Sequence, residues 1–171
     1  QRFLREHGTG VDNLGRHMLA RIVAEYVNPT VLDIACGSAV TYEVLKNFSV
    51  KCQYTGFDRT KKLLAEARRR YGDEITLVEG YAQNLPFEDN SFQVVFIRHL
   101  LEHLKEGYEQ VIKEAFRVAS KEVILVFFLT PHPGDEDIIK ESEPDENGCT
   151  YFWNQYSYPK LFNFLSKFNY S

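Results

Sequence analysis

Short apolar segments rich in β-branched residues alternate with longer segments of helical periodicity through most of the chain. These apolar segments are largely continuous, which is typical of strands that are buried on both faces of a parallel sheet. We predict five strands, over Thr30–Ile34, Gln53–Phe57, Ile75–Val78, Val94–Ile97 and Val123–Leu129. Because the helices that connect parallel strands cover both faces of a sheet, the pattern predicts a Rossmann-like, doubly wound α/β fold with a mainly parallel sheet.

Four amphipathic helices are expected around these strands. In the first two, the residues expected to face the core are Leu14, Met18, Ile22 and Tyr26, and then Leu63, Leu64, Ala67 and Tyr71. The other two helices are predicted over Gly107–Ala119 and Ser157–Lys167. No internal repeat and no linker divides the 171 residues, so we expect a single domain over residues 1–171.

The composition narrows the class of protein. The 24 acidic residues exceed the 20 lysines and arginines, which is the wrong balance for binding nucleic acid by bulk charge. Six basic residues between Arg59 and Arg70 could form a patch that binds RNA or an acidic substrate, but basic residues on the outer face of an amphipathic helix are usually only solvated. The longest uncharged apolar run, Val123–Leu129, is too short to span a membrane, so we expect no membrane association. Three cysteines without a C-x-x-C pair argue against disulfides and zinc knuckles and favour the cytoplasm.

The segment Val31–Ala39 reads as a buried strand that runs into a tight turn of small residues and then a helix. Small residues allow a ligand to approach the backbone, and the helix N-terminus presents free N–H groups, although a purely structural turn has the same appearance. Asp33 at the end of the strand would repel a pyrophosphate and attract an ammonium or sulfonium group. Asp58 ends the next strand 25 residues later, where an acidic residue can bind ribose hydroxyls. The segment lacks two glycines of the dinucleotide pattern G-x-G-x-x-G, which leaves a nicotinamide oxidoreductase as a minor alternative.

With these residues the sequence resembles the class I S-adenosylmethionine-dependent methyltransferases, in particular the small domains called type 11. The resemblance covers nearly the whole chain in four ordered motifs: Val31–Ala39, Tyr54–Asp58, Glu79–Phe92 and Phe96–Leu104. It implies an enzyme with S-adenosylmethionine as cofactor and a small-molecule acceptor, methylated on oxygen, nitrogen or carbon.

The resemblance also implies roles for individual residues, which are expectations here. Asp33 would orient the methionyl amino group, Ala35 and Gly37 would supply close backbone, and Asp58 would bind the ribose. The adenine would lie beside Arg59, Tyr81, Ala82 and Gln83. Arg98 and His99 would border the methyl group and the acceptor. Independently of the resemblance, His99, or as second choice His132, is the candidate catalytic base, because each follows a strand end that faces the ligand crevice, although either could be a positioning or surface residue.

The sequence departs from the family pattern at several places. Ala35 and Ala39 replace frequent glycines, and Tyr81 replaces an aspartate that accepts the adenine amino group. The chain also ends shortly after its last predicted helix, whereas the family adds two further strands, so we expect a C-terminal truncation. An uncovered apolar edge on the fifth strand would then favour a homo-oligomer. These departures support an alternative, a catalytically inactive methyltransferase-like binding or regulatory module.

Three further patterns have competing interpretations. The segment His99–His103 matches the zinc-peptidase pattern H-x-x-E-H, but it follows a buried strand directly, so we expect no metal site and give His103 a structural or substrate-side role. The segment 131–150 holds seven acidic residues against Lys140 and is expected to be a solvated loop or a lid. Trp153 and Tyr156 could wall an apolar substrate pocket, whereas Phe162 is expected in the core.

Overall fold

The computed structural model describes residues 3–5, 14–146 and 148–168. Its strands are β1 (Phe3–Arg5), β2 (Thr30–Ile34), β3 (Gln53–Asp58), β4 (Thr76–Glu79), β5 (Phe92–Arg98) and β6 (Ala119–Phe127). Its helices are α1 (Leu14–Val23), α2 (Val40–Asn47), α3 (Lys61–Tyr71), α4 (Tyr108–Val118) and α5 (Tyr158–Leu165), with short 3₁₀ helices η1 (Gly72–Glu74) and η2 (Leu101–His103). Among the residues described, no helix is long and apolar enough to cross a membrane.

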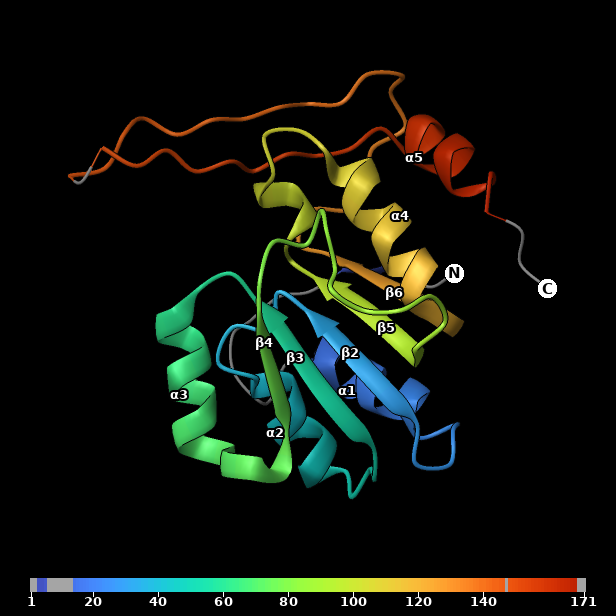
Figure 1. The fold of residues 1–171 in the computed structure, drawn as a ribbon. Helices are drawn as coiled ribbons and strands as arrows, with labels where there is room; N and C mark the ends of the chain where they lie inside the picture. Colours follow the sequence, from blue (N-terminus) through green and yellow to red (C-terminus); the bar gives the residue numbers. More distant parts are fainter. Residues whose placement is uncertain (1–2, 6–13, 147, 169–171) are drawn as a thin grey trace.

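The strands form one parallel sheet in the order β1-β6-β5-β2-β3-β4 (Figure 1). From β2 the chain proceeds outward through β3 to β4 and then returns to the other side of β2 as β5. The carboxyl ends of β2 and β5 therefore flank the point at which the strand order reverses, where open α/β sheets bind ligands. The predicted doubly wound α/β fold is confirmed.

Two apolar layers cover the sheet. Side chains of α1, α2 and α3 pack on one face, and those of α4 and α5 pack on the other. Successive residues of the central strands alternate between the two layers: Val95 and Ile97 contact the second layer, and Val94 and Phe96 contact the first. Both faces of the sheet are buried, which explains the continuous apolar runs in the sequence.

The edge of β6 is covered where the sequence predicted no neighbour. Backbone pairing joins Phe3, Leu4 and Arg5 of β1 to Leu125, Val126 and Phe127. The expectation of an uncovered fifth strand is therefore wrong along this part of β6. Phe3–Arg5 alone are too few residues to show a strand pattern in the sequence, and tertiary pairing decides their conformation.

Some predicted core positions are also wrong. Leu14 and Leu63 are exposed, and α1 buries Leu19, Ile22 and Val23, because a spacing of four residues drifts around a helix of 3.6 residues per turn. Phe162 is 54% exposed, and α5 packs through Leu161 and Leu165 instead.

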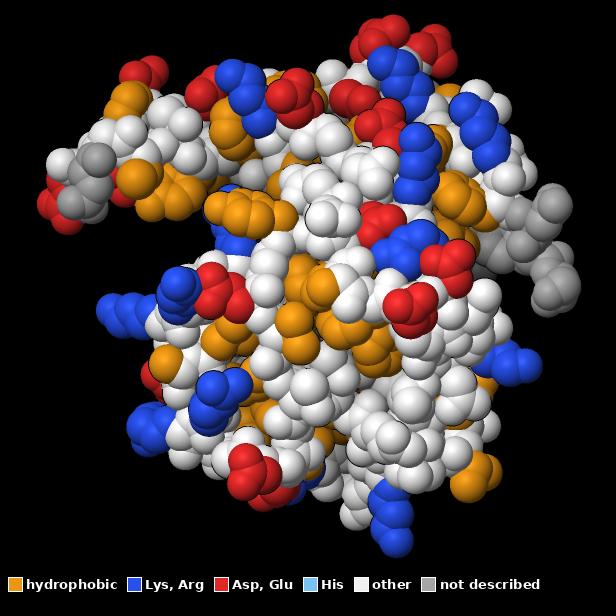
Figure 2. Space-filling view, in the orientation of Figure 1, with side chains coloured by type: hydrophobic (Ala, Val, Ile, Leu, Met, Phe, Trp, Pro, Cys, Tyr) orange, Lys and Arg blue, Asp and Glu red, His pale blue; other side chains and the backbone are white. Residues whose placement is uncertain are grey.

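The acidic segment forms an ordered feature that we call the acidic arm (residues 131–155). Backbone hydrogen bonds between Ile138 and Gln155, from Trp153 to Lys140 and from Ser142 to Tyr151 join its two sides as an antiparallel ribbon. Figure 2 shows the arm projecting from the domain over a hollow, with acidic side chains along it. The predicted loop is thus a ribbon that extends to residue 155.

Candidate functional site

The turn between β2 and α2 is fastened to the neighbouring strand. The N–H groups of Ala35 and Cys36 both donate to the carbonyl oxygen of Phe57, at 2.8 and 3.1 Å. Ala35, Gly37 and Ala39 all have φ near +60°, in the left-handed region, where alanine is less stable than glycine by about 1 kcal/mol. The backbone strain therefore lies in the turn that the predicted cofactor would approach.

Asp58 joins the end of β3 to this turn. Its Oδ2 accepts from the N–H of Gly37 at 2.8 Å, and its Oδ1 accepts from the N–H of Thr60 at 2.8 Å. The residue is only 8% exposed, yet it lines a pocket at the carboxyl ends of the strands. A carboxylate has about four acceptor sites, so each oxygen retains the capacity to accept a further hydrogen bond.

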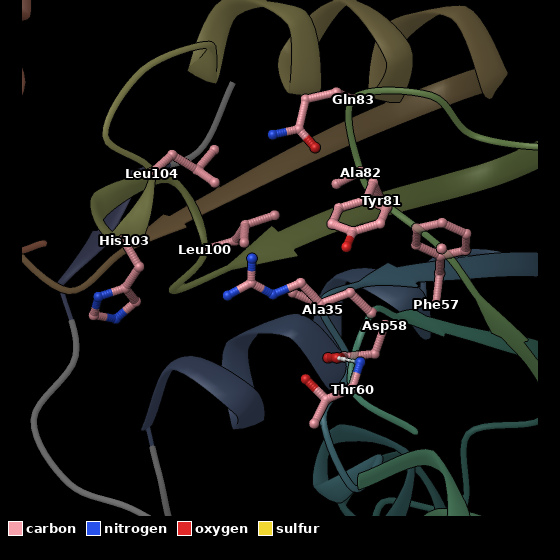
Figure 3. Close-up of a pocket in the computed structure, with 12 residues that line it drawn as sticks. Ala35, Phe57, Asp58, Thr60, Tyr81, Ala82, Gln83, Leu100, His103 and Leu104 are labelled. Atoms are coloured by element: carbon pink, nitrogen blue, oxygen red, sulfur yellow. Dashed lines mark hydrogen bonds between the residues drawn. The ribbon is translucent and has the colours of Figure 1, made fainter. Parts of the chain in front are cut away.

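Segments from three strand ends and η2 form this pocket (Figure 3). Six residues predicted to bind the cofactor line it: Ala35, Asp58, Arg59, Tyr81, Ala82 and Gln83. The pocket lining does not include Asp33, Gly37 or Arg98, although the N–H of Gly37 donates to the carboxylate of Asp58, which does line the pocket. Leu100, His103 and Leu104 complete the wall on the far side from Asp58.

Asp33 lies beneath the turn, in the sheet. It is 1% exposed, and its Oδ2 accepts a 2.5 Å hydrogen bond from the Tyr54 hydroxyl. Burial raises the pKa of Asp33 to about 7, against the lowering effects of the Tyr54 hydrogen bond and of the positive charges on Arg98 and Arg16. A further positive charge beside this carboxyl would lower its pKa, because it would stabilise the ionised form.

The segment that follows β4 forms the pocket side opposite the turn. Gly80 donates its N–H to the carbonyl of Asp58, and a Cβ at Gly80 would lie 2.6 Å from Cζ of the Phe57 ring. Tyr81 is 68% exposed, so its hydroxyl is not a buried counterpart of the family aspartate.

Two residues of α4 hold the rest of this segment. Glu114 accepts from the N–H of Leu85 at 2.7 Å, and Arg117 donates to the carbonyls of Leu85 and Phe87 and to the carboxylate of Asp89. Arg117 also pairs with Glu114 at 2.8 Å. The segment is thereby fixed to the helix that packs behind it.

The two candidate bases lie beyond strand ends, but neither lines the pocket. His99 follows β5 with φ of +52°, and its ring lies 5.8 Å from that of Phe128. His132 lies at the base of the acidic arm, where its Nδ1 accepts from the N–H of Gly134 at 3.1 Å. Their catalytic role remains a prediction.

His103 lines the pocket. From the sequence, this residue was expected to have a structural or substrate-side role. It ends η2, whereas His99 precedes that helix with a left-handed backbone, so the two histidines do not share one helix. Within the described part of the chain, no three His, Cys, Asp or Glu side chains are grouped so that they could hold a metal ion. Leu100 and Thr60 were also missed, and their position two residues after a strand end was the available signal. Leu104, which was missed too, follows η2 and had no such signal.

The aromatic residues predicted to wall the pocket do not do so. Tyr156 is buried against Tyr108, with ring centroids 4.3 Å apart, and Trp153 is exposed on the acidic arm. Core packing between α4 and α5 explains the position of Tyr156, so that prediction is wrong.

Comparisons with known proteins agree on one family. The family described as a methyltransferase domain matches residues 32–127. A demethylmenaquinone methyltransferase from Thermotoga maritima is 32% identical over 118 residues, covering 68% of this chain and 50% of that protein. The chain therefore spans about half the length of the curated relatives that it matches.

Solved structures show the same fold at low sequence identity. A protein from Pyrococcus horikoshii OT3 aligns with a TM-score of 0.66 at 18% identity, covering 94% of this chain and 84% of that one. A SAM-dependent methyltransferase from Methanosarcina mazei aligns with a TM-score of 0.65 at 19% identity, covering 85% of this chain and 82% of that one.

Proposed function

The chain belongs to the methyltransferase-domain family of class I S-adenosylmethionine-dependent methyltransferases, and on this premise we propose that it binds S-adenosylmethionine in the described pocket and methylates a small molecule. The observation that carries the proposal is Asp58, a nearly buried carboxylate that is fixed to the turn at Gly37 and lines the pocket. Bound there, the cofactor would supply an electrophilic methyl group on a sulfonium.

The residues around the pocket fit this cofactor. Asp58 would accept from the ribose hydroxyls, and the backbone at Ala35 and Gly37 would allow close approach. Arg59, Tyr81, Ala82 and Gln83 would surround the adenine, with Tyr81 unable to replace a buried aspartate. A missing hydrogen bond to the adenine amino group would weaken binding by about 1 to 3 kcal/mol.

The methionyl end would lie toward Asp33 and Arg98. The pKa of Asp33 is raised to about 7, mainly by burial, so an ammonium group placed beside it would favour the ionised carboxylate. Arg98 already contributes positive charge to this region and would border the transferred methyl group. These assignments make ionisation of Asp33 part of cofactor binding.

The acceptor is proposed to be a small, largely apolar ring compound. Relatives of this chain are named for demethylmenaquinone, a quinone, and the pocket wall contains Leu100 and Leu104. Transfer requires the nucleophilic atom to lie about 3 Å from the methyl group and to lose a proton. We propose His99, and as second choice His132, as the group that accepts this proton. Replacing each with alanine and measuring kcat tests this assignment.

Thermal melting with ligands tests cofactor binding. S-adenosylhomocysteine at 100 times its dissociation constant is expected to stabilise the protein by about 2.7 kcal/mol, or roughly 5 to 10 °C, and NADH is expected to have no effect. Asp58→Asn should remove most of that shift, judged against the variant's own melting temperature. Asp73→Asn, at an exposed position on η1, is the matched control and should keep it.

An inactive binding module is the second candidate, favoured by the exposed Tyr81. It predicts a chain that melts cooperatively with a weak shift, or none, from either adenosyl ligand. A full shift that Asp58→Asn abolishes would count against it, and methyl transfer to an acceptor would exclude it.

A further inference from the structure

Tyr54 and Asp33 form a hydrogen bond between neighbouring strands, beneath the turn that follows β2. In the register of β2 and β3, Asp33 lies opposite Gly56 and Tyr54 lies opposite Val31. Residues two positions apart in a strand project from the same face of a sheet, so the side chains of Asp33 and Tyr54 share one face. The Tyr54 hydroxyl donates to Oδ2 of Asp33 at 2.5 Å, and the two residues are only 3% and 1% exposed. The bond is therefore shielded from water.

This hydrogen bond favours the ionised form of Asp33. Burial and the charge of Asp33 raise the pKa of Tyr54 well above its usual value, so the hydroxyl keeps its proton and can donate it. Its distance from Oδ2 is typical of a bond from a hydroxyl to a carboxylate. The nearby thiols of Cys36 and Cys52 stay neutral, because burial raises the pKa of each. A donated hydrogen bond stabilises the carboxylate more than the neutral carboxyl.

Charged side chains on three other parts of the fold also act on Asp33. Arg98 at the end of β5 and Arg16 on α1 lower its pKa, whereas Asp58 at the end of β3 raises it. Burial has the largest effect and raises the pKa to about 7. Among the groups that oppose burial, the Tyr54 hydroxyl has the largest effect. The charge of Asp33 near neutral pH therefore depends strongly on Tyr54.

The ring of Tyr54 is held in place by other aromatic side chains. It packs against the ring of Tyr42 on α2, with centroids 5.1 Å apart, and Tyr42 meets the ring of Tyr71 on α3 edge-on at 5.2 Å. The Tyr42 hydroxyl donates to Glu74 at 3.1 Å. Two adjacent tyrosines thus have hydroxyls with different partners, and a group that is placed in advance needs little ordering when a ligand binds.

We propose that Tyr54 is a positioning residue for cofactor binding, whose hydroxyl fixes the Asp33 carboxylate and maintains its negative charge for the ammonium group of S-adenosylmethionine. Each carboxylate oxygen can accept about two hydrogen bonds, so the bond from Tyr54 leaves capacity for the ammonium. Asp33 precedes by two residues Ala35, which lines the pocket. The proposal rests on the proposed function for placing the ammonium beside Asp33. It gives cofactor binding a pH dependence that Tyr54 controls.

The pH dependence of S-adenosylhomocysteine binding tests the proposal, because this ligand carries the same ammonium group. Its dissociation constant would be measured by isothermal titration on the full chain, between about pH 5.5 and pH 8. The affinity of the unaltered chain should fall as pH drops below 7, approaching tenfold per pH unit, as Asp33 becomes protonated. Titration of the ligand is common to all the variants, so differences between their profiles report the protein.

Three variants assign the pH dependence to the hydrogen bond. Tyr54→Phe keeps the ring and should raise the pKa of Asp33. With a rise of about 1 in that pKa, the variant would bind about twofold more weakly than the unaltered chain at pH 8 and about tenfold more weakly at pH 6. Tyr42→Phe, which removes a hydroxyl from the adjacent ring, is the matched control and should bind as the unaltered chain does at every pH. In the Asp33→Asn background, Tyr54→Phe should have the same effect at all pH values.

A loss of affinity in Tyr54→Phe that is equal at every pH would indicate a purely structural role and would overturn the proposal. A pH-dependent loss in Tyr42→Phe, or one that persists in the Asp33→Asn background, would also overturn it. One comparison does not require a tyrosine variant to fold: the fall in affinity below pH 7 should disappear in Asp33→Asn, and its persistence would contradict the proposal. Failure of the proposed function would appear differently, as no binding of S-adenosylhomocysteine to the unaltered chain at any pH.

Discussion

At the scale of single residues, the site depends on groups held in unfavourable states. Ala35 and Ala39 adopt left-handed backbone conformations, and the carboxyl of Asp33 is removed from water. Both features raise the free energy of the folded chain, and both lie in the turn and strand beneath the predicted cofactor. Such local strain is frequent where a protein is organised around a ligand.

Asp33 should make stability depend on pH. Its pKa is raised from 3.8 to about 7, mainly by burial, so the stabilisation that protonation gives is fully present below about pH 4 and is lost as pH rises through 7. An asparagine side chain at this position would not titrate. The unfolding free energy of Asp33→Asn relative to the unaltered chain should therefore shift in favour of the variant by a few kcal/mol between pH 4 and 8. Urea unfolding at several pH values measures this difference, and a constant difference would contradict the assignment.

Gly80 should be intolerant of a side chain. An added Cβ would lie 2.6 Å from the ring of Phe57, which is buried and cannot swing away. Gly80→Ala should lower the unfolding free energy by about 1 to 3 kcal/mol and weaken binding of S-adenosylhomocysteine. Combining it with Phe57→Leu, which makes room for the methyl group, should recover part of the loss. Strict additivity of the two changes in urea unfolding would show that this contact is not the cause.

At the scale of elements, the acidic arm has two parts with different tasks. Its outer part, beyond Lys140, carries exposed side chains, whereas the return strand near Asn154 makes the hydrogen bonds that hold η2. A loop of this length in a compact domain usually has a function. Here its base forms part of the site, through the wall that contains His103.

Asn154 and the arm tip should therefore respond differently to change. Asn154→Ala removes a hydrogen bond to the buried turn and should lower the unfolding free energy by about 1 to 3 kcal/mol. Replacing residues 142–151 with an Asn-Gly turn should leave the melting temperature within about 1 °C, because surface changes are small in energy. Differential scanning calorimetry of both variants checks this. A large loss from shortening the tip would mean that the outer arm also packs on the domain.

At the scale of the whole molecule, β1 completes the sheet beside β6. Its three paired residues cover the carboxyl half of an apolar strand, Val123–Phe127, whose edge would otherwise present free backbone groups. Strand pairing between residues about 120 positions apart thus occupies an edge at which a second copy could otherwise pair.

Removing residues 1–6 tests that role. We expect a loss of about 1 to 3 kcal/mol in unfolding free energy and concentration-dependent dimers in sedimentation velocity, because the edge of β6 becomes available to a second copy. The full chain at the same concentration is the control. A shortened chain that stays monomeric would show that β1 is not needed to protect the edge.

Much of the fold was predictable because its signals are local. The five predicted strands were placed within a few residues of their bounds, since each is a short, largely apolar run with polar or turn residues at its ends. The missed strand, Phe3–Arg5, has no such run around it. Helix faces were predicted less well, as Leu14 and Phe162 show, because the choice of buried face depends on which neighbour the helix meets.

By itself, the sequence determined the parallel α/β architecture, the turn after the first predicted strand, and the two carboxylates, Asp33 and Asp58, because periodicity and the residue types at strand ends are properties of short segments. The tertiary structure alone decided that Asp58 fastens the turn, that β1 covers β6, and that the arm orients His103. These features join residues 21 to about 120 positions apart, and the contact between His103 and Phe152 spans 49. Contacts of that range are fixed only when the sheet and its helices have packed together.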